Sequence, residues 1–199
     1  IVANFSAHKH VRSEKDKWSV QALIENNDVK AKKLMDLLSI YPPKHFFCVS
    51  TDKAANPVNI MGASKRIMED LVMAYNQKFP VTTARFANVA FSDGSLLHGF
   101  IQRIAKMQPF SAPYDVRRYF ISHEEAGQLC LLSCFLGENR DIYFPKLSEK
   151  SDLLTFSEIA LLVLEAYGFI PELCASEDEA KEKADRMIAG SKKWPCYFF

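Results

Sequence analysis

Between residues 46 and 69 the chain reads FFCVSTDKAANPVNIMGASKRIME, and this stretch decides the fold class. The apolar run at residues 46–49 predicts a buried strand, and residues 59–69 have the apolar spacing of a helix. The Thr-Asp-Lys triplet at residues 51–53 therefore follows the carboxyl end of a strand, where open α/β sheets bind their ligands. An acid beside a base at that edge indicates proton transfer.

Strand and helix patterns alternate on both sides of this stretch. We expect strands over residues 1–7 and 81–86, and helices over residues 18–38 and 59–79, the first with an irregularity at residues 26–28. Such alternation predicts an α/β fold with a Rossmann-like, doubly wound parallel sheet and right-handed crossovers.

The pattern loosens after residue 90, where we expect a small mixed α/β lobe. Its elements should intertwine with those of the first domain, so we place the domains at residues 1–90 and 91–199. Further helices are expected over residues 95–107, 122–135, 159–167 and 176–188, and short strands over residues 118–121 and 141–144. Thr155 and Glu158 have the spacing of a capping box.

Composition excludes several classes of function. The 199 residues suffice for one domain or one domain plus a small lobe, and 48% hydrophobic with 25% charged residues is an ordinary globular composition. A net charge of +1 gives no preference for nucleic acid or a membrane surface. The five cysteines lack zinc-site spacing, so we expect core residues and no metal site. No run approaches the roughly 20 apolar residues of a membrane span.

Met61 and Lys65 lie one helical turn apart and face the same way. Their segment resembles the active-site helix of the extended short-chain dehydrogenase/reductases, which carries Tyr-x-x-x-Lys. Within these enzymes, Ser-Thr-Asp-Lys-Ala-x-Asn-Pro-x-Asn at residues 50–59 resembles the nucleotide-sugar 4,6-dehydratases of polysaccharide biosynthesis, which act on UDP-N-acetylglucosamine. Methionine replaces the tyrosine here, as in a subset of that family. A thioether exchanges no proton, so either Asp52 and Lys53 do the acid–base work or the chain is not an active enzyme.

The resemblance implies a reaction with NAD or NADP as cofactor. Hydride leaves C4 of the sugar, water is lost across C5 and C6, and hydride returns to C6. We assign Lys53 as the base at C5 and Asp52 as the acid at the C6 hydroxyl and the candidate acceptor of the C4 hydroxyl proton. Thr51 would bond near that C4 hydroxyl, and Lys65 would bond the nicotinamide ribose. Lys53 must be neutral to act, so we expect burial or nearby cations to lower its pKa.

Two segments of the first domain resemble the family's cofactor site. Residues 4–11, Asn-Phe-Ser-Ala-His-Lys-His-Val, resemble the strand end that passes the nicotinamide ribose, so Lys9 and His10 would contact the cofactor or the sugar diphosphate. Asn27 falls where the family has an asparagine, although Asn26 is a competing assignment. The resemblance thus implies cofactor contacts from Ser6, Ala7, Lys9, Asn27 and Lys65.

Two segments of the second half resemble the family's substrate site. Arg-Phe-Ala-Asn-Val at residues 85–89 matches Arg-x-x-Asn-Val, which implies Asn88 at the substrate diphosphate and Val89 at the nicotinamide. Ser95 opens a helix, and helix N-termini favour anions. Arg118 matches the arginine of the family's Thr-Arg-Phe segment. An arginine of the family's loop before Ser95 is lost here, which alters the diphosphate contacts.

In this fold class, the turn between the first strand and the first helix carries a Gly-rich dinucleotide-binding motif. None of the 7 glycines of this sequence forms that motif. Because Ile1 already falls in an expected strand, we expect a fragment that lacks the N-terminal part and is inactive alone. Residues 1–90 are then a partial NAD(P)-binding domain and residues 91–199 the substrate-binding lobe. The resemblance also implies a UDP-sugar substrate, a homo-oligomer and a cytoplasmic enzyme, with a membrane anchor before Ile1 left open, as some relatives have one.

Two other functions stay open. A nucleotide-sugar 4-epimerase needs no acid–base pair for elimination, so the Asp52–Lys53 pair opposes it. A non-catalytic nucleotide-sugar or dinucleotide-binding module is favoured by Met61. The sequence leaves open NAD or NADP, UDP or GDP, and the configuration at C5.

Overall fold

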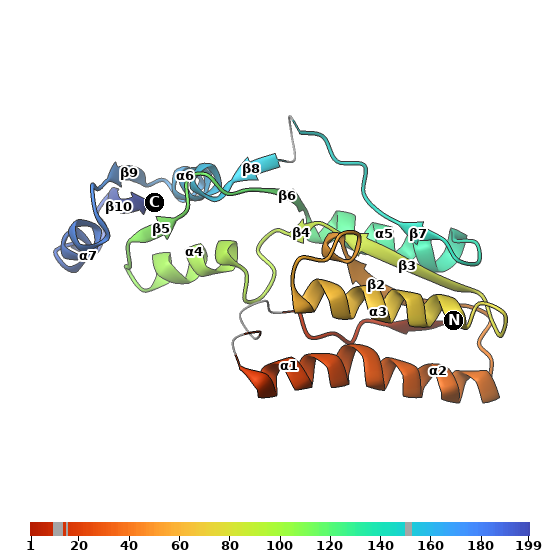
Figure 1. Cartoon of the computed structure of the whole chain (residues 1–199). Coiled ribbons are helices and arrows are strands. Elements are labelled where there is room, and N and C mark those ends of the chain that lie inside the picture. The colour runs from red at the N-terminus through yellow and green to blue at the C-terminus, as the bar shows by residue number, and fades with distance from the viewer. Residues whose placement is uncertain (10–13, 15, 150–152) are drawn as a thin grey trace. The chain divides into compact units, whose positions relative to one another are not determined.

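The computed structural model of the chain describes residues 1–9, 14, 16–149 and 153–199. The chain divides into two compact units (Figure 1). The first unit comprises Ile1–Ala87 and His123–Lys146, and the second comprises Asn88–Ser122 and Leu147–Phe199. Each unit is therefore discontinuous in sequence, with the first change of unit directly after Ala87.

The first unit contains a four-stranded parallel sheet with strand order β1-β2-β3-β7. Its strands are β1 (Val2–Asn4), β2 (Phe46–Thr51), β3 (Val81–Phe86) and β7 (Ile142–Tyr143). Phe46 pairs with Val2 on one side and Val81 on the other, and Thr51 pairs with Phe86. The expected parallel α/β sheet is confirmed, and the carboxyl ends of β1, β2 and β3 share one edge.

Helices cover both faces of this sheet. On one face lie α1 (Lys17–Ile24), the π-helical turn η2 (Glu25–Val29), α2 (Lys30–Ile40) and α3 (Ile60–Ala74), and on the other lies α5 (His123–Leu136) (Figure 1). Successive side chains of β2 point to opposite faces of the sheet. Phe46 and Cys48 therefore pack against α2 and α3, whereas Phe47 packs against Cys134 on α5. The first unit is thus a three-layer α/β/α arrangement.

Several predicted elements were too long, among them the first strand and the helix after the Thr-Asp-Lys turn. The strand expected over residues 1–7 ends at Asn4, whose side-chain oxygen accepts a hydrogen bond from the Ser6 N–H at 3.0 Å and turns the chain. The helix expected over residues 59–79 ends at Ala74. A turn follows because the Asn76 side chain bonds the Met73 carbonyl at 2.6 Å. The expected irregularity at residues 26–28 is the π-helical turn η2.

The second unit has two three-stranded sheets. One is parallel, with β10 (Lys193–Phe198) between β5 (Phe110–Ala112) and β9 (Ile170–Leu173). In the other, β6 (Arg117–Ile121) pairs in parallel with β4 (Asn88–Val89) and antiparallel with β8 (Leu153–Thr155). Its helices are α4 (Leu96–Ala105), α6 (Phe156–Ala166) and α7 (Glu177–Asp185).

An aromatic core holds the second unit together. The ring of Phe110 stacks on Phe100 at a centroid distance of 4.7 Å and meets the edge of Trp194 at 6.4 Å. The Trp194 indole N–H donates to the Gln108 carbonyl at 3.0 Å, so its polar atom is satisfied inside the core. The predicted Thr155 capping box is confirmed at the start of α6.

Candidate functional site at the end of β2

The turn after β2 brings three predicted catalytic residues together. A 3₁₀ turn, η3 (Asp52–Ala54), begins where β2 ends, and Thr51 caps it. The Thr51 hydroxyl donates to Asp52 Oδ1 at 2.8 Å, and Lys53 Nζ donates to the same oxygen at 3.0 Å. The side chains of Asp52 and Lys53 are 47% and 31% exposed, so a ligand can reach both. The acid and the base therefore share one oxygen atom at the carboxyl edge of the sheet.

A glycine lets α3 approach this turn closely. The Asn59 side chain caps α3 by accepting from the Gly62 N–H at 2.8 Å. A Cβ at Gly62 would lie 2.8 Å from the Lys53 backbone carbonyl oxygen. Any larger residue at this position would push η3, and with it Lys53, away from the helix.

Met61 and Lys65 lie on the buried side of α3. Met61 is 5% exposed and Lys65 is 4% exposed. Lys65 Nζ donates to the Val49 carbonyl of β2 at 3.2 Å and contacts the Met68 sulfur at 3.7 Å. Burial lowers the pKa of the Lys65 ammonium, against the opposing effects of Cys48, Glu69 and Asp28. The sequence pattern did not predict that Lys65 would be tied to a strand carbonyl.

Asn27 connects the end of β1 to α3. Its side-chain oxygen accepts from the His8 N–H at 2.8 Å, while its nitrogen donates to the His8 carbonyl at 3.0 Å and to the Ser64 hydroxyl at 3.0 Å. Asn27 is 1% exposed, whereas Asn26 is half-buried and accepts a hydrogen bond from Lys30 Nζ at 3.2 Å. Within the described residues, Asn27 is thus the candidate asparagine that bonds the segment after β1.

That segment contains three more predicted cofactor residues. Ser6 and Lys9 are exposed and Ala7 is half-buried, and all three follow β1 at the carboxyl edge of the sheet. Asn27 fixes the backbone between Ala7 and Lys9 through His8. His10, the other predicted residue of this segment, lies outside the described residues.

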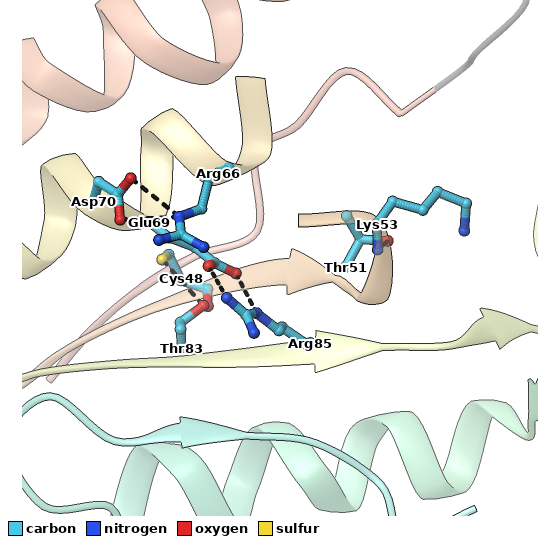
Figure 2. Close-up of polar contacts among 8 residues, drawn as sticks. All are labelled: Cys48, Thr51, Lys53, Arg66, Glu69, Asp70, Thr83 and Arg85. Atoms are coloured by element: carbon cyan, nitrogen blue, oxygen red, sulfur yellow. Dashed lines mark hydrogen bonds and ion pairs between the residues drawn. The ribbon is translucent and has the colours of Figure 1, made fainter. Parts of the chain in front are cut away.

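A buried ion pair between α3 and β3 was not predicted. Arg85 Nε and Nη2 donate to the two carboxylate oxygens of Glu69 at 3.0 and 2.6 Å (Figure 2). The Glu69 side chain is 3% exposed. Figure 2 also shows Lys53 extending away from this pair. The sequence showed Arg85 only as the first residue of the Arg-x-x-Asn-Val motif.

Asp28 is a second unpredicted residue close to Lys65. It is 8% exposed, and its Oδ1 atom is buried without a hydrogen-bond partner among the described residues. Burial raises the pKa of Asp28 to about 6, against the attraction of Lys65. A signal for its burial exists, because the buried apolar residues Ala31 and Met35 follow Asp28 by three and seven positions, the spacing of one helix face.

The remaining predicted residues belong to the second unit. Asn88 donates from its side chain to the Tyr119 carbonyl at 3.0 Å, and Val89 pairs with Ile121. Ser95 caps α4 by accepting from the His98 N–H at 3.1 Å. Arg118 is exposed on β6. Asn88 and Ser95 therefore have structural partners within their own unit.

Neither metal ligation nor membrane crossing has a visible basis in the described parts of the chain. Within residues 1–9, 14, 16–149 and 153–199, His, Cys, Asp and Glu form no cluster suited to a metal ion. In the same ranges no helix combines the length and apolar character that a bilayer requires. The Cys48, Cys134 and Cys196 side chains are buried, which confirms the expected core role for these three.

A model of the family described as polysaccharide biosynthesis protein matches residues 1–185. The chain belongs to this polysaccharide biosynthesis protein family. The probable polysaccharide biosynthesis protein EpsC of Bacillus subtilis is 30% identical over 190 residues, which cover 94% of the chain and 31% of EpsC. The UDP-N-acetylglucosamine 4,6-dehydratase (inverting) of Campylobacter jejuni strain 81-176 is 30% identical over 156 residues, or 74% of the chain and 46% of the enzyme. The chain thus spans less than half the length of either relative.

The fold also matches solved structures. DesIV, a dTDP-glucose 4,6-dehydratase of Streptomyces venezuelae solved with NAD and TYD bound, superposes with a TM-score of 0.73. The match covers 98% of the chain and 63% of DesIV at 17% identity. At this identity the likeness establishes the α/β fold, and it agrees with the parallel sheet described above.

Proposed function

We propose that this member of the polysaccharide biosynthesis protein family is part of a nucleotide-sugar 4,6-dehydratase. One observation carries the proposal: Lys53 Nζ and the Thr51 hydroxyl both bond Asp52 Oδ1, at 3.0 and 2.8 Å, beyond the carboxyl end of β2. Elimination of water needs a base and an acid close together, and this turn provides both. Met61 offers neither, because a thioether has no exchangeable proton.

The described residues fit one end of a nicotinamide cofactor, NAD or NADP. Polar groups after β1 and β2 lie at the same edge of a parallel sheet, where such ligands bind. Asn27 holds the His8 peptide from both sides, which fixes the path of Ser6 and Ala7. We propose that Ser6, Ala7, Lys9 and Asn27 shape this part of the site, with Lys65 as its positive charge and Val89 at the nicotinamide. When bound, the cofactor supplies the acceptor and donor of hydride.

The proton transfers can be balanced with two side chains. The Asp52 carboxylate accepts the C4 hydroxyl proton as C4 is oxidised, and Thr51 orients that hydroxyl. The Lys53 amine then removes the C5 proton, while Asp52 passes its proton to the C6 hydroxyl, which leaves as water. Lys53 returns a proton to C5 when hydride arrives at C6. Each group ends in the protonation state in which it began.

Lys53 must lose its proton before it can act as a base. Its side chain is 31% exposed without substrate, so burial by the protein alone is incomplete. We propose that the bound sugar covers the part of this side chain that is exposed.

The substrate is proposed from the C. jejuni relative, whose name specifies UDP-N-acetylglucosamine. We assign the first unit to the cofactor and the second unit to the sugar nucleotide, in line with the predicted split near residue 90. Asn88, Ser95 and Arg118 are the proposed contacts to the diphosphate, with Lys9 and His10 from the first unit. A cytoplasmic homo-oligomer remains part of the proposal.

One rival has a specific observation in its favour. Met61 is buried and cannot serve as the acid–base residue of a dehydrogenase-type site, as expected of a non-catalytic nucleotide-sugar or dinucleotide-binding module. A 4-epimerase is the other alternative, but it needs no acid–base pair for elimination.

Proton NMR in deuterated water separates these functions. A preparation with the complete cofactor-binding domain is given UDP-N-acetylglucosamine and NAD. A dehydratase produces a 6-deoxy methyl signal with deuterium at C5. An epimerase produces a second N-acetylhexosamine without a methyl signal, and a binding module leaves the sugar unchanged. If the UDP-linked sugar gives either of the last two results, the test is repeated with a GDP-linked sugar. The same outcome there would overturn the proposal.

A further inference from the structure

Lys65 is a buried amine whose charged form requires a compensating negative charge. It is 4% exposed, and its hydrogen bond goes to a neutral acceptor, the Val49 carbonyl, at 3.2 Å. A buried charge without an opposite charge is strongly disfavoured. The ionisable groups that act on Lys65 are Cys48 on β2, Glu69 on α3 and Asp28 on η2.

Two of these three groups cannot supply a free negative charge. Glu69 gives both carboxylate oxygens to the guanidinium of Arg85, at 3.0 and 2.6 Å, so its charge is already matched. Burial raises the pKa of the Cys48 thiol to about 11, which keeps it neutral. Figure 2 shows the bonds of both groups: Glu69 accepts from Arg85, and the Cys48 thiol donates to the Thr83 hydroxyl.

Asp28 is the remaining carboxylate. It is 8% exposed, and its Oδ1 atom has no hydrogen-bond partner within the described ranges. The preceding residue, Asn27, bonds the hydroxyl of Ser64, which immediately precedes Lys65. The π-helical turn η2 therefore brings Asp28 up to the part of α3 that carries Lys65.

We propose that Asp28 is the counter-ion of Lys65 and thereby a positioning residue of this site. Both side chains are buried where η2 packs against α3, and there the Asp28 carboxylate favours the charged form of Lys65. Any catalytic consequence rests on the proposed function, in which Lys65 supplies positive charge at the cofactor. The charge coupling itself depends only on the fold of the first unit.

The coupling can be measured in the 199-residue chain without cofactor or substrate. Lysine labelled with ¹³C at Cε reports the ionisation of Lys65, and a Lys65→Met variant assigns its signal. We expect Asp28→Asn to lower the pH midpoint of Lys65 by about half a unit or more, because one nearby negative charge is lost. Asp70→Asn is the matched control, since Asp70 lies exposed on the same helix and pairs with Arg66. An equal midpoint in Asp28→Asn and Asp70→Asn would overturn the proposal.

A reciprocal arm keeps the test decisive if Asp28→Asn fails to fold. In the Lys65→Met chain, the ¹³Cγ signal of Asp28 should titrate at a higher pH than in the unaltered chain, because coupling between two sites is mutual. An unchanged Asp28 midpoint would contradict the proposal. Because neither arm involves turnover, a failure here is distinct from a failure of the dehydratase assay.

Discussion

Glu69 on α3 and Arg85 on β3 form a bidentate ion pair, with nitrogen–oxygen distances of 3.0 and 2.6 Å. Arg85 is also the register partner of Ser50, the residue before Thr51. The pair therefore locks the helix that carries Met61 and Lys65 to the strands that present the Asp52–Lys53 turn. Removal of either partner should loosen the site as well as the fold.

Arg85→Met should lower the free energy of unfolding by about 3–5 kcal/mol, because it leaves the Glu69 carboxylate buried without its partner. Arg66→Met is the control: Arg66 pairs with Asp70 on the exposed side of the same helix (Figure 2), and its loss should cost at most about 1 kcal/mol. Urea unfolding of both variants measures the difference. Equal, small effects would show that the buried pair contributes little.

Gly62→Ala should destabilise the chain by about 1–3 kcal/mol, since the new Cβ would lie 2.8 Å from the Lys53 carbonyl oxygen and force the backbone apart. Gly127→Ala on α5 provides the opposite case, because a Cβ there meets nothing within 4 Å. Alanine in an open helix position should stabilise by about 0.5–1 kcal/mol. Urea midpoints that shift in the same direction would argue against close packing at Gly62.

Asn27→Ala should remove three hydrogen bonds, two to the His8 backbone and one to Ser64. We expect a loss of about 2–4 kcal/mol, because the His8 peptide groups lose their partners. Amide hydrogen exchange at His8 should accelerate in the same variant. Asn26→Ala, the neighbouring position, should change neither quantity, and an equal response in both variants would refute the assignment of Asn27.

Much of the first unit could be predicted from local sequence. β2 begins with the apolar run at residues 46–49, and β3 is rich in β-branched residues and buried over residues 81–84. The second unit was harder, because β10 contains Pro195 at the centre of a parallel sheet. Proline lacks the N–H that a central strand normally uses, so it argues against a strand in sequence terms.

The turn that holds the proposed catalytic triplet, residues 51–53, could be predicted because its members are neighbours in sequence. The groups around Lys65 could not, because Asp28 precedes it by 37 positions and Arg85 follows it by 20. Only the packing of η2 and β3 against α3 brings these charges to one place. Buried polar residues such as Asp28 and Lys65 depart from the apolar pattern that predicts the inward side of a helix.

Asp28→Asn should change how stability depends on pH. Burial raises the pKa of Asp28 from 3.8 to about 6, so between these values the folded chain holds a proton that the unfolded chain has lost. Stability of the unaltered chain should therefore fall as pH rises through this window and then level off. The variant should not show this fall, since asparagine does not ionise, so the difference in unfolding free energy between the two chains should change by about 2–3 kcal/mol between pH 4 and pH 7. Urea unfolding from pH 3.5 to 8 measures this, and a constant difference would contradict it.

We propose that Lys53 is the base at C5 of the sugar and that Met61 takes no part in proton transfer. The most direct measurement is the rate of deuterium incorporation at C5 of UDP-N-acetylglucosamine in deuterated water, for a Lys53→Met and a Met61→Leu variant of the enzyme with its complete cofactor-binding domain. Lys53→Met should slow incorporation by about 10²–10⁴-fold, because the base is lost. Met61→Leu should retain most of the rate, since it conserves volume at a buried position. Near-normal incorporation in Lys53→Met would contradict the account.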